Sequence, residues 1–353
     1  MASSTGVLSK IIVRLKKYYY QVAPLSSALK QLRKNNKIVV LMYHEVLRGD
    51  IESWTVVEER SFIQQMTYLK EHFRLLSIDD ALLASQNRAV IDGDDRPLAV
   101  VTFDDGYAGN FHVMLPIINR LEIPVTIYVS TLAVEQGSTY WYDRIINVVQ
   151  SDESIKLDLS KHGLGCYNIN ACGGSESWKV IQQLLTDLKE VDYKIRTVIT
   201  DDVINQVKAI CGEMASDVMP LRQMSIDDVK SMARHPLVTI GAHSHCHNML
   251  VQIPREEAEQ SIKKSKTLLE EWTGQDVTCF AYPNGNYNEE LIGIVRDAGF
   301  VSAVTTEAGE WTSEDCDYSI PRRSVGRYDS FSYFKMNVSG VLPSVKEALN
   351  KSG

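Results

Sequence analysis

Apolar runs and helical patterns alternate along much of the chain. Runs made mostly of apolar or β-branched residues lie at 37–43, 98–103, 124–129, 237–242, 277–282 and 300–304. Continuous apolar runs of this length are typical of strands buried on both faces of a parallel sheet. Amphipathic helical spacing separates them, at 58–72, 111–121, 255–272 and 289–298. The alternation predicts an α/β fold, and about seven such strand–helix units would form an irregular barrel.

The alternation stops between about residues 131 and 225, a stretch that predicts a helical insertion. It has helical patterns at 142–150, 178–191 and 201–214, a weak strand pattern at 155–159 and a Gly-, Cys- and Asn-rich loop at 163–175. An insertion of this kind could form a wall or lid over a substrate site. We therefore expect a barrel over 38–330 that contains the insertion, followed by a C-terminal helical segment at 331–353.

The first 37 residues form a basic, amphipathic arm that carries eight Lys or Arg residues and no acidic residue. Two interpretations remain open for this arm. It could be an interfacial helix drawn to anionic lipid headgroups, or a basic surface helix packed on the acidic remainder of the chain. The arm lacks the uncharged apolar core of a signal peptide, and no segment approaches the ~20 apolar residues that span a bilayer. We expect a cytoplasmic protein, which under the first of these interpretations contacts the inner face of the membrane through this arm.

Composition narrows the class of protein further. The 353 residues are 44% hydrophobic and 23% charged, which is ordinary for a globular protein. A net charge of −8 argues against general nucleic-acid binding, which needs a concentrated positive field. The six cysteines are scattered without a CxxC pair, a pattern typical of reduced thiols.

Polar groups follow four of the predicted strands. His44 follows the first, Asp104 and Asp105 follow the second, His243 follows the fourth and Asn284 follows the fifth. Because the carboxyl ends of the strands in a parallel barrel meet on one face, we expect these groups to converge.

The strongest local signal is the histidine-rich stretch at 241–248. His243 and His247 are four residues apart, so a helical turn would point both imidazoles the same way. Two imidazoles and one carboxylate form a set that suits Zn²⁺ and other divalent transition ions. A second carboxylate could serve as the base for an activated water, and His44 is the candidate acid on the other side. We give His245 no ligand role.

These residues resemble the motifs of the polysaccharide deacetylases, carbohydrate esterase family 4. The two most specific matches are Thr102–Tyr107 (T-F-D-D-G-Y) and His243–His247 (H-S-x-x-H). Three further stretches resemble a branch of the family in which the general-acid motif has moved to the N-terminal side: Leu41–Val46, Phe280–Gly285 and Ile320–Val325.

The resemblance implies a distorted (β/α)7 barrel that removes an N- or O-acetyl group from a sugar with the help of one divalent metal ion. The ion would be Zn²⁺ first, with Co, Ni, Mn and Fe as alternatives. Asp104 would be the general base and His44 the acid, while a backbone N–H near Asn284 would stabilise the oxyanion. The resemblance assigns the metal to Asp105, His243 and His247, and substrate contact to Tyr107 and Tyr282.

The third motif departs from the common family form. The arginine expected two residues before the proline is Ala281, and the tyrosine expected after it is Asn284. Asp104 thus lacks its usual charge partner, and we expect Arg322 or Arg323 to supply it from another strand.

We expect an acetylated sugar as the substrate, on an intracellular nucleotide-linked or lipid-linked glycan precursor for surface polysaccharide. Two other functions stay open: an amide hydrolase for non-sugar substrates with the same metal site, and a non-catalytic glycan-binding barrel. The sequence does not indicate the oligomeric state.

Overall fold

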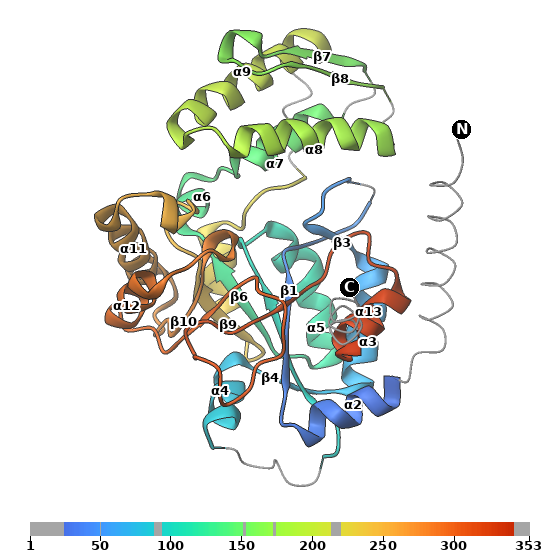
Figure 1. The fold of residues 1–353 in the computed structure, drawn as a ribbon, viewed down its shortest axis with the longest axis vertical. Coiled ribbons are helices and arrows are strands. Elements are labelled where there is room, and N and C mark those ends of the chain that lie inside the picture. Colours follow the sequence, from blue (N-terminus) through green and yellow to red (C-terminus); the bar gives the residue numbers. More distant parts are fainter. Residues whose placement is uncertain are drawn as a thin grey trace, which may run out of the picture.

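A curled parallel sheet lies at the centre of the molecule, with helices packed around it (Figure 1). The computed structural model describes residues 25–49, 51–87, 94–150, 153–171, 174–212 and 220–341. The sheet has the strand order β11-β10-β9-β6-β5-β1-β12. Strand β4 lies off this path and pairs with the first half of β5. Its strands are β1 (Ile38–Tyr43), β4 (Arg74–Leu76), β5 (Leu98–Phe103), β6 (Val125–Val129), β9 (Val238–Ala242), β10 (Cys279–Ala281), β11 (Ser302–Val304) and β12 (Arg323–Ser324).

The two ends of this strand order come together near residue 320. Val304 forms a parallel bridge with Ile320, and three residues later Arg323 pairs with Leu41 of β1. The segment 320–324 thus lies between β11 and β1 and curls the sheet into a distorted barrel. The predicted fold class is confirmed.

The apolar strand runs are explained by burial on both faces. In β1, Val39, Leu41 and Tyr43 pack into the cluster formed with the surrounding helices. The alternate residues Ile38 and Val40 pack into a smaller cluster inside the curl, with Trp311 and Ile320 among others. Because successive strand side chains point to opposite faces, both sets must be apolar.

The helices between the strands follow the predicted pattern. They are α3 (Glu59–His72), α4 (Ile78–Asn87), a π-helical turn (Asn110–Met114) that leads into α5 (Leu115–Leu121), α10 (Ile226–Ala233), α11 (Arg255–Thr273) and α12 (Glu289–Asp297). Two short strands, β2 (Glu45–Leu47) and β3 (Val56–Glu58), form a separate parallel pair. None of the described helices is long and apolar enough to cross a membrane.

Each end of the chain contributes one described helix. Helix α2 (Leu25–Lys34) belongs to the N-terminal arm, and α13 (Phe331–Val338) begins the C-terminal segment. The predictions for residues 1–24 and 342–353 lie outside the described residues.

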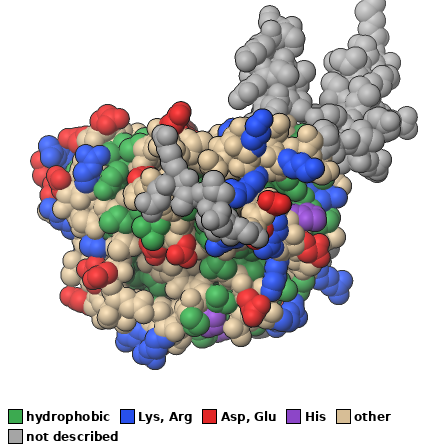
Figure 2. Space-filling model, turned by 90° about the horizontal axis from the view of Figure 1, so that it is seen from below, with side chains coloured by type: hydrophobic (Ala, Val, Ile, Leu, Met, Phe, Trp, Pro, Cys, Tyr) green, Lys and Arg blue, Asp and Glu red, His purple; other side chains and the backbone are tan. Residues whose placement is uncertain are grey.

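The face seen from below in Figure 2, opposite the insertion, carries interspersed acidic and basic side chains.

The insertion has a hydrophobic core of its own and stands at the top of Figure 1. It comprises α6 (Thr131–Gln136), α7 (Trp141–Val149), β7 (Ile155–Asp158), β8 (Cys166–Ile169), α8 (Ser175–Lys189) and α9 (Tyr193–Cys211). The expected loop at 163–175 proves to contain β8, which pairs antiparallel with β7. Only Tyr167 and Ile169 of this strand are buried, so the alternating pattern is too short to stand out in the sequence.

Candidate metal centre and active site

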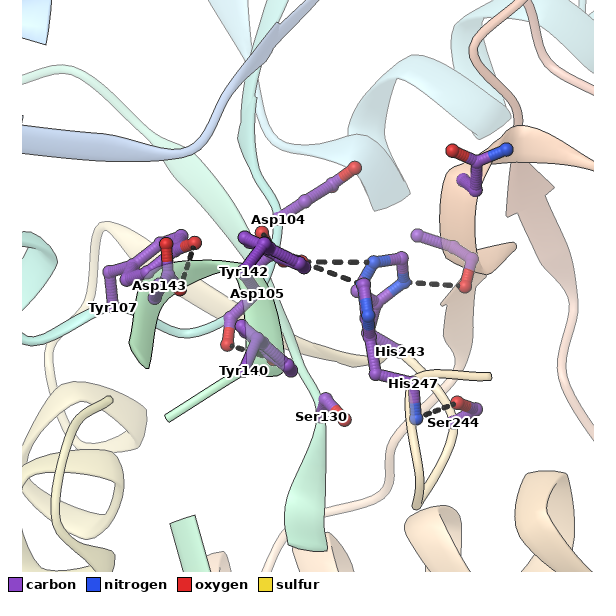
Figure 3. A network of polar contacts seen from close by, with 12 residues as sticks. Asp104, Asp105, Tyr107, Ser130, Tyr140, Tyr142, Asp143, His243, Ser244 and His247 are labelled. Atoms are coloured by element: carbon purple, nitrogen blue, oxygen red, sulfur yellow. Dashed lines mark hydrogen bonds and ion pairs between the residues drawn. The ribbon is translucent and has the colours of Figure 1, made fainter. Parts of the chain in front are cut away.

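Asp105, His243 and His247 form a compact cluster where β5 and β9 end (Figure 3). Their ligand atoms all lie within 4.8 Å of one another. Asp105 Oδ1 lies 3.4 Å from His243 Nε2 and 3.0 Å from His247 Nε2. Two imidazole nitrogens and one carboxylate oxygen are the donors that Zn²⁺ and related ions prefer, so these residues fit a divalent metal. Within the described residues this is the one group of three such ligands.

The local backbone, not a helical turn, brings the two histidines together. Ser244 and His247 have positive φ angles of 60° and 54°, so the expected helical turn at 243–247 is wrong. The Ser244 hydroxyl accepts a 3.1 Å hydrogen bond from the His247 backbone N–H and closes the turn. Asp105 also has a positive φ, of 76°. Left-handed conformations of non-glycine residues are costly and tend to occur at functional sites.

A hydrogen bond at Nδ1, the ring nitrogen that does not face Asp105, fixes the orientation of the His243 ring. Its Nδ1 lies 2.8 Å from the carbonyl oxygen of Ala281, so Nδ1–H donates and Nε2 is left free to face Asp105. Such an outer hydrogen bond sets the tautomer of a metal-binding histidine. Burial raises the pKa of Asp105, but the interactions of the carboxylate with His247 and His243 outweigh it and hold the pKa well below its ordinary value.

Asp104 is held by a two-pronged ion pair with Arg322. The Arg322 Nη1 and Nη2 atoms lie 2.7 and 2.6 Å from the two carboxylate oxygens, and both side chains are buried. Arg322 also donates to the Thr305 carbonyl (2.7 Å) and the Thr102 hydroxyl (3.1 Å). Burial raises the pKa of Asp104, and Arg322 lowers it by more, so the carboxyl stays ionised.

Of the two arginines considered, Arg322 is the one that contacts Asp104. Arg323 pairs with Glu310 and lies 3.4 Å from the Asn337 side-chain oxygen, on the other side of the same strand. Adjacent residues of an extended segment point in opposite directions, which explains the difference.

A cavity of about 630 Å³ joins most of the expected site residues. Asp104, Asp105, His243 and His247 line it together with His44 and Asn284. His44 directly follows β1, and Asn284 lies in a short turn (Pro283–Gly285) after β10, with a φ of 57°. Arg322 lies behind Asp104, outside the lining.

The expectation that Tyr107 and Tyr282 contact substrate needs correction. Both rings are fully buried, and neither is among the residues that line the cavity. Tyr107 donates a 2.7 Å hydrogen bond to Asp143, and Tyr282 donates a 3.1 Å hydrogen bond to the Tyr318 carbonyl. Their side chains are drawn into the core because each is large and finds a buried hydrogen-bond partner there.

The insertion supplies contacts that sequence reasoning missed. The Tyr140 hydroxyl donates to the Asp105 carbonyl at 2.8 Å, and the Tyr142 hydroxyl lies 3.4 Å from Asp105 Oδ2. The Tyr140 ring centroid is 4.4 Å from that of His247. The only sequence signal was the aromatic run at 140–142, shortly after β6. Trp54, Lys189 and Arg196 also line the cavity, and no motif marks them.

The fold is similar to those of solved deacetylase structures. The Streptococcus pyogenes deacetylase PplD in complex with acetate matches with a TM-score of 0.56 and 18% identity, over 87% of this chain and 97% of that one. IcaB from Ammonifex degensii matches with a TM-score of 0.51 and 18% identity, over 86% of this chain and 96% of that one. At these identities the likeness shows the fold alone.

Sequence comparison identifies the family. YxkH of Bacillus subtilis (strain 168), whose name assigns it provisionally to the polysaccharide deacetylases, is 30% identical over 128 residues. That match spans 36% of this chain and only 46% of the relative. The polysaccharide deacetylase family model matches residues 92–303, more than half of the chain. The chain therefore belongs to the polysaccharide deacetylase family.

Proposed function

We propose that this protein is a metal-dependent hydrolase that removes an N-acetyl or O-acetyl group from a sugar. Membership of the family supports a hydrolytic carbohydrate deacetylase. The observation that carries the proposal is the placement of an ionised Asp104 beside the Asp105–His243–His247 cluster in one cavity. Base and metal ligands at adjacent positions are what hydrolysis by an activated water requires.

Asp104 is the base in this proposal. A divalent cation at Asp105, His243 and His247 would supply Lewis-acid polarisation of the acyl carbonyl and of the attacking water. Asp104 takes the proton of that water, since its carboxylate lines the cavity and remains ionised. Arg322 fixes the plane of the carboxylate through both oxygens.

His44 acts on the leaving group, and the backbone near Asn284 acts on the oxyanion. His44 lines the cavity at the end of β1 and is close enough to act electrostatically on both aspartates. We assign it the proton that the leaving amine or alkoxide needs. The backbone N–H near Asn284 stabilises the oxyanion.

Aromatic side chains in the cavity favour a sugar as the substrate. Trp54, Tyr140 and Tyr142 are among the lining residues, and Trp54 and Tyr142 lie 6.2 Å apart between ring centroids. Aromatic rings offer apolar faces for the C–H faces of pyranose rings, and the hydroxyl of tyrosine adds a polar contact.

The test is metal content together with acetate release, for the native protein and Asp104→Asn. We expect about one metal per chain in both, acetate from an N-acetylhexosamine in the native protein, and a rate about 10²–10⁴-fold lower in the variant. Acetate from amides that lack a sugar would favour the non-sugar hydrolase, and metal without any hydrolysis would favour a binding protein. A native protein without metal would overturn the site assignment.

The identity of the metal, the cellular location and the precursor substrate stay predictions. Zn²⁺ as the bound ion is tested by the same metal analysis. The cytoplasmic location, the contact with the inner membrane face and the intracellular precursor depend on the basic arm, of which residues 1–24 lie outside the described residues.

A further inference from the structure

Two cationic side chains of the insertion reach the cavity that holds the metal cluster. Lys189 is the last residue of α8, and Arg196 lies in the first turn of α9. They are the two Lys or Arg residues among the described residues that line this cavity. Neither residue belongs to the family motifs described above.

Neither cation forms a salt bridge with a carboxylate in the described part of the chain, although the charge of Asp192 acts on Arg196 from a distance. The Lys189 ammonium donates a 3.0 Å hydrogen bond to the neutral side-chain oxygen of Asn284. The Arg196 guanidinium is half-buried and lies over the Trp141 ring, 5.0 Å from its centroid. No described group accepts a hydrogen bond from it. Its donors are therefore available to an anionic ligand in the cavity.

Two acidic residues, Glu190 and Asp192, lie between the two cations in the sequence. Asp192 caps α9, where its carboxylate accepts hydrogen bonds from the backbone N–H groups of Lys194 (2.9 Å) and Ile195 (3.4 Å). Glu190 and Asp192 line an adjacent groove but not the cavity. Both cations thus line the cavity while the neighbouring carboxylates do not, which leaves the cations available to a ligand there.

Lys189 and Arg196 lie where the cavity meets that groove. Both residues line both spaces, as do Tyr193, Met249 and Asn284. The groove continues along Val191 and Ile253, away from the metal cluster. A ligand with its acetyl group at the metal cluster and a long substituent in the groove would pass both cations.

We propose that Lys189 and Arg196 bind a phosphate or diphosphate ester carried by the acetylated sugar, an inference that rests on the deacetylase function proposed above. The guanidinium supplies a planar fork of donors that matches phosphate oxygens, and the ammonium supplies a point charge beside it. A diphosphate carries enough charge and acceptor oxygens for two cations, whereas a single carboxylate carries one charge. The groove then receives the group beyond the phosphate.

The substrate panel should separate phosphate from its carrier. We would measure kcat/KM for acetate release from methyl N-acetylglucosaminide, N-acetylglucosamine 1-phosphate, UDP-N-acetylglucosamine and a polyprenyl-diphosphate-linked N-acetylglucosamine. We expect at least a tenfold preference for phosphorylated over neutral sugar, which weakens as salt screens the charges. The substrate with the highest kcat/KM identifies a simple phosphate, a nucleotide or a lipid as the carrier.

Variants then test the two residues. Lys189→Gln and Arg196→Gln should each lower the preference for the phosphorylated sugar about tenfold, through KM. Lys194→Gln is the matched control, because Lys194 is an exposed neighbour on α9 that lines neither space, and it should retain the full preference. Equal kcat/KM for neutral and phosphorylated sugars, or an unchanged preference in both variants, would overturn the inference.

A binding readout separates this inference from the proposed function. Calorimetry of UDP-N-acetylglucosamine and N-acetylglucosamine 1-phosphate with Asp104→Asn does not depend on turnover. Binding that is lost in Asp104→Asn/Arg196→Gln would support the phosphate site even if no sugar released acetate. Acetate release with no binding preference for phosphate would leave the deacetylase standing and refute the phosphate site.

Discussion

Asp104 and Arg322 each depend on the other, because both charges are buried in one ion pair. Replacing Arg322 with alanine leaves the Asp104 carboxylate without its partner. We expect Arg322→Ala to lower the free energy of unfolding by about 3–5 kcal/mol and to reduce activity. Adding Asp104→Asn should restore part of the stability but not the activity. Urea denaturation of the single and double variants provides the measurement.

Arg48→Ala is the control for this prediction. Arg48 forms an ion pair with Glu59 on the surface, where water screens the charges, so its loss should change stability little. An Arg322→Ala protein as stable as Arg48→Ala would contradict the account of Asp104.

Asp143 makes stability depend on pH. Burial, and to a lesser degree the charge of Asp105, raise its pKa well above the ordinary value, and its Oδ1 atom has no partner within the described residues. The folded state therefore holds a proton that the unfolded chain releases at lower pH. Stability should fall as pH rises from the ordinary carboxyl pKa toward the raised one, by about 1.4 kcal/mol for each unit between them.

Asp143→Asn should remove this dependence. The amide keeps an acceptor for the Tyr107 hydroxyl and carries no charge. The difference in urea midpoint between the variant and the native protein should grow in the variant's favour between pH 4 and 7. A constant difference over that range would mean that Asp143 is ionised in the folded protein.

Strand β9 is packed closely against its two neighbours just before His243. A Cβ atom at Gly241 would lie 2.5 Å from the Tyr128 ring on β6 and 2.8 Å from the Cys279 sulfur on β10. Gly241→Ala must push the strands apart, which we expect to cost about 1–3 kcal/mol and to weaken metal binding by shifting His243. Gly293→Ala in α12 meets open space and should stabilise the protein by about 0.5–1 kcal/mol. Titration with Zn²⁺ and thermal unfolding would compare the two variants.

Whether an element could be predicted from sequence depended on how fully it is buried. Strands such as β1 and β5 are almost entirely apolar because both faces are covered, and their ends indicate where the polar residues gather. Strand β8 has only two buried residues, so its sequence predicts a loop. The turn at 243–247 depends on left-handed residues that the spacing of the histidines does not reveal.

The partner of Asp104 could only be narrowed to two residues. The choice of Arg322 over Arg323 depends on the register of β12 against β1, which a two-residue strand does not disclose. The contacts of Tyr140, Tyr142, Lys189 and Arg196 depend on how the insertion packs on the barrel, and no motif encodes that placement.

At the scale of the molecule, the metal cluster connects segments far apart in the chain. Asp105 follows β5, while His243 and His247 follow β9. An ion bound there would stabilise the folded state over the unfolded one, by about 2.7 kcal/mol at a hundredfold excess over Kd. Chelation should lower the Tm of the native protein and leave that of His247→Ala unchanged. His72→Ala, which changes an exposed histidine on α3, should respond to chelation like the native protein.

The pairing of Asp104 with a residue 218 positions later has a consequence for biosynthesis. The ribosome makes the two aspartates and both histidines of the site well before Arg322. Until Arg322 leaves the exit tunnel, the nascent chain can bury Asp104 only by protonating it or leaving it unpaired. The same late segment closes the sheet between β11 and β1. Folding of the catalytic end of the barrel therefore has to wait until residues 320–324 have left the exit tunnel, and chains released before residue 322 would be inactive.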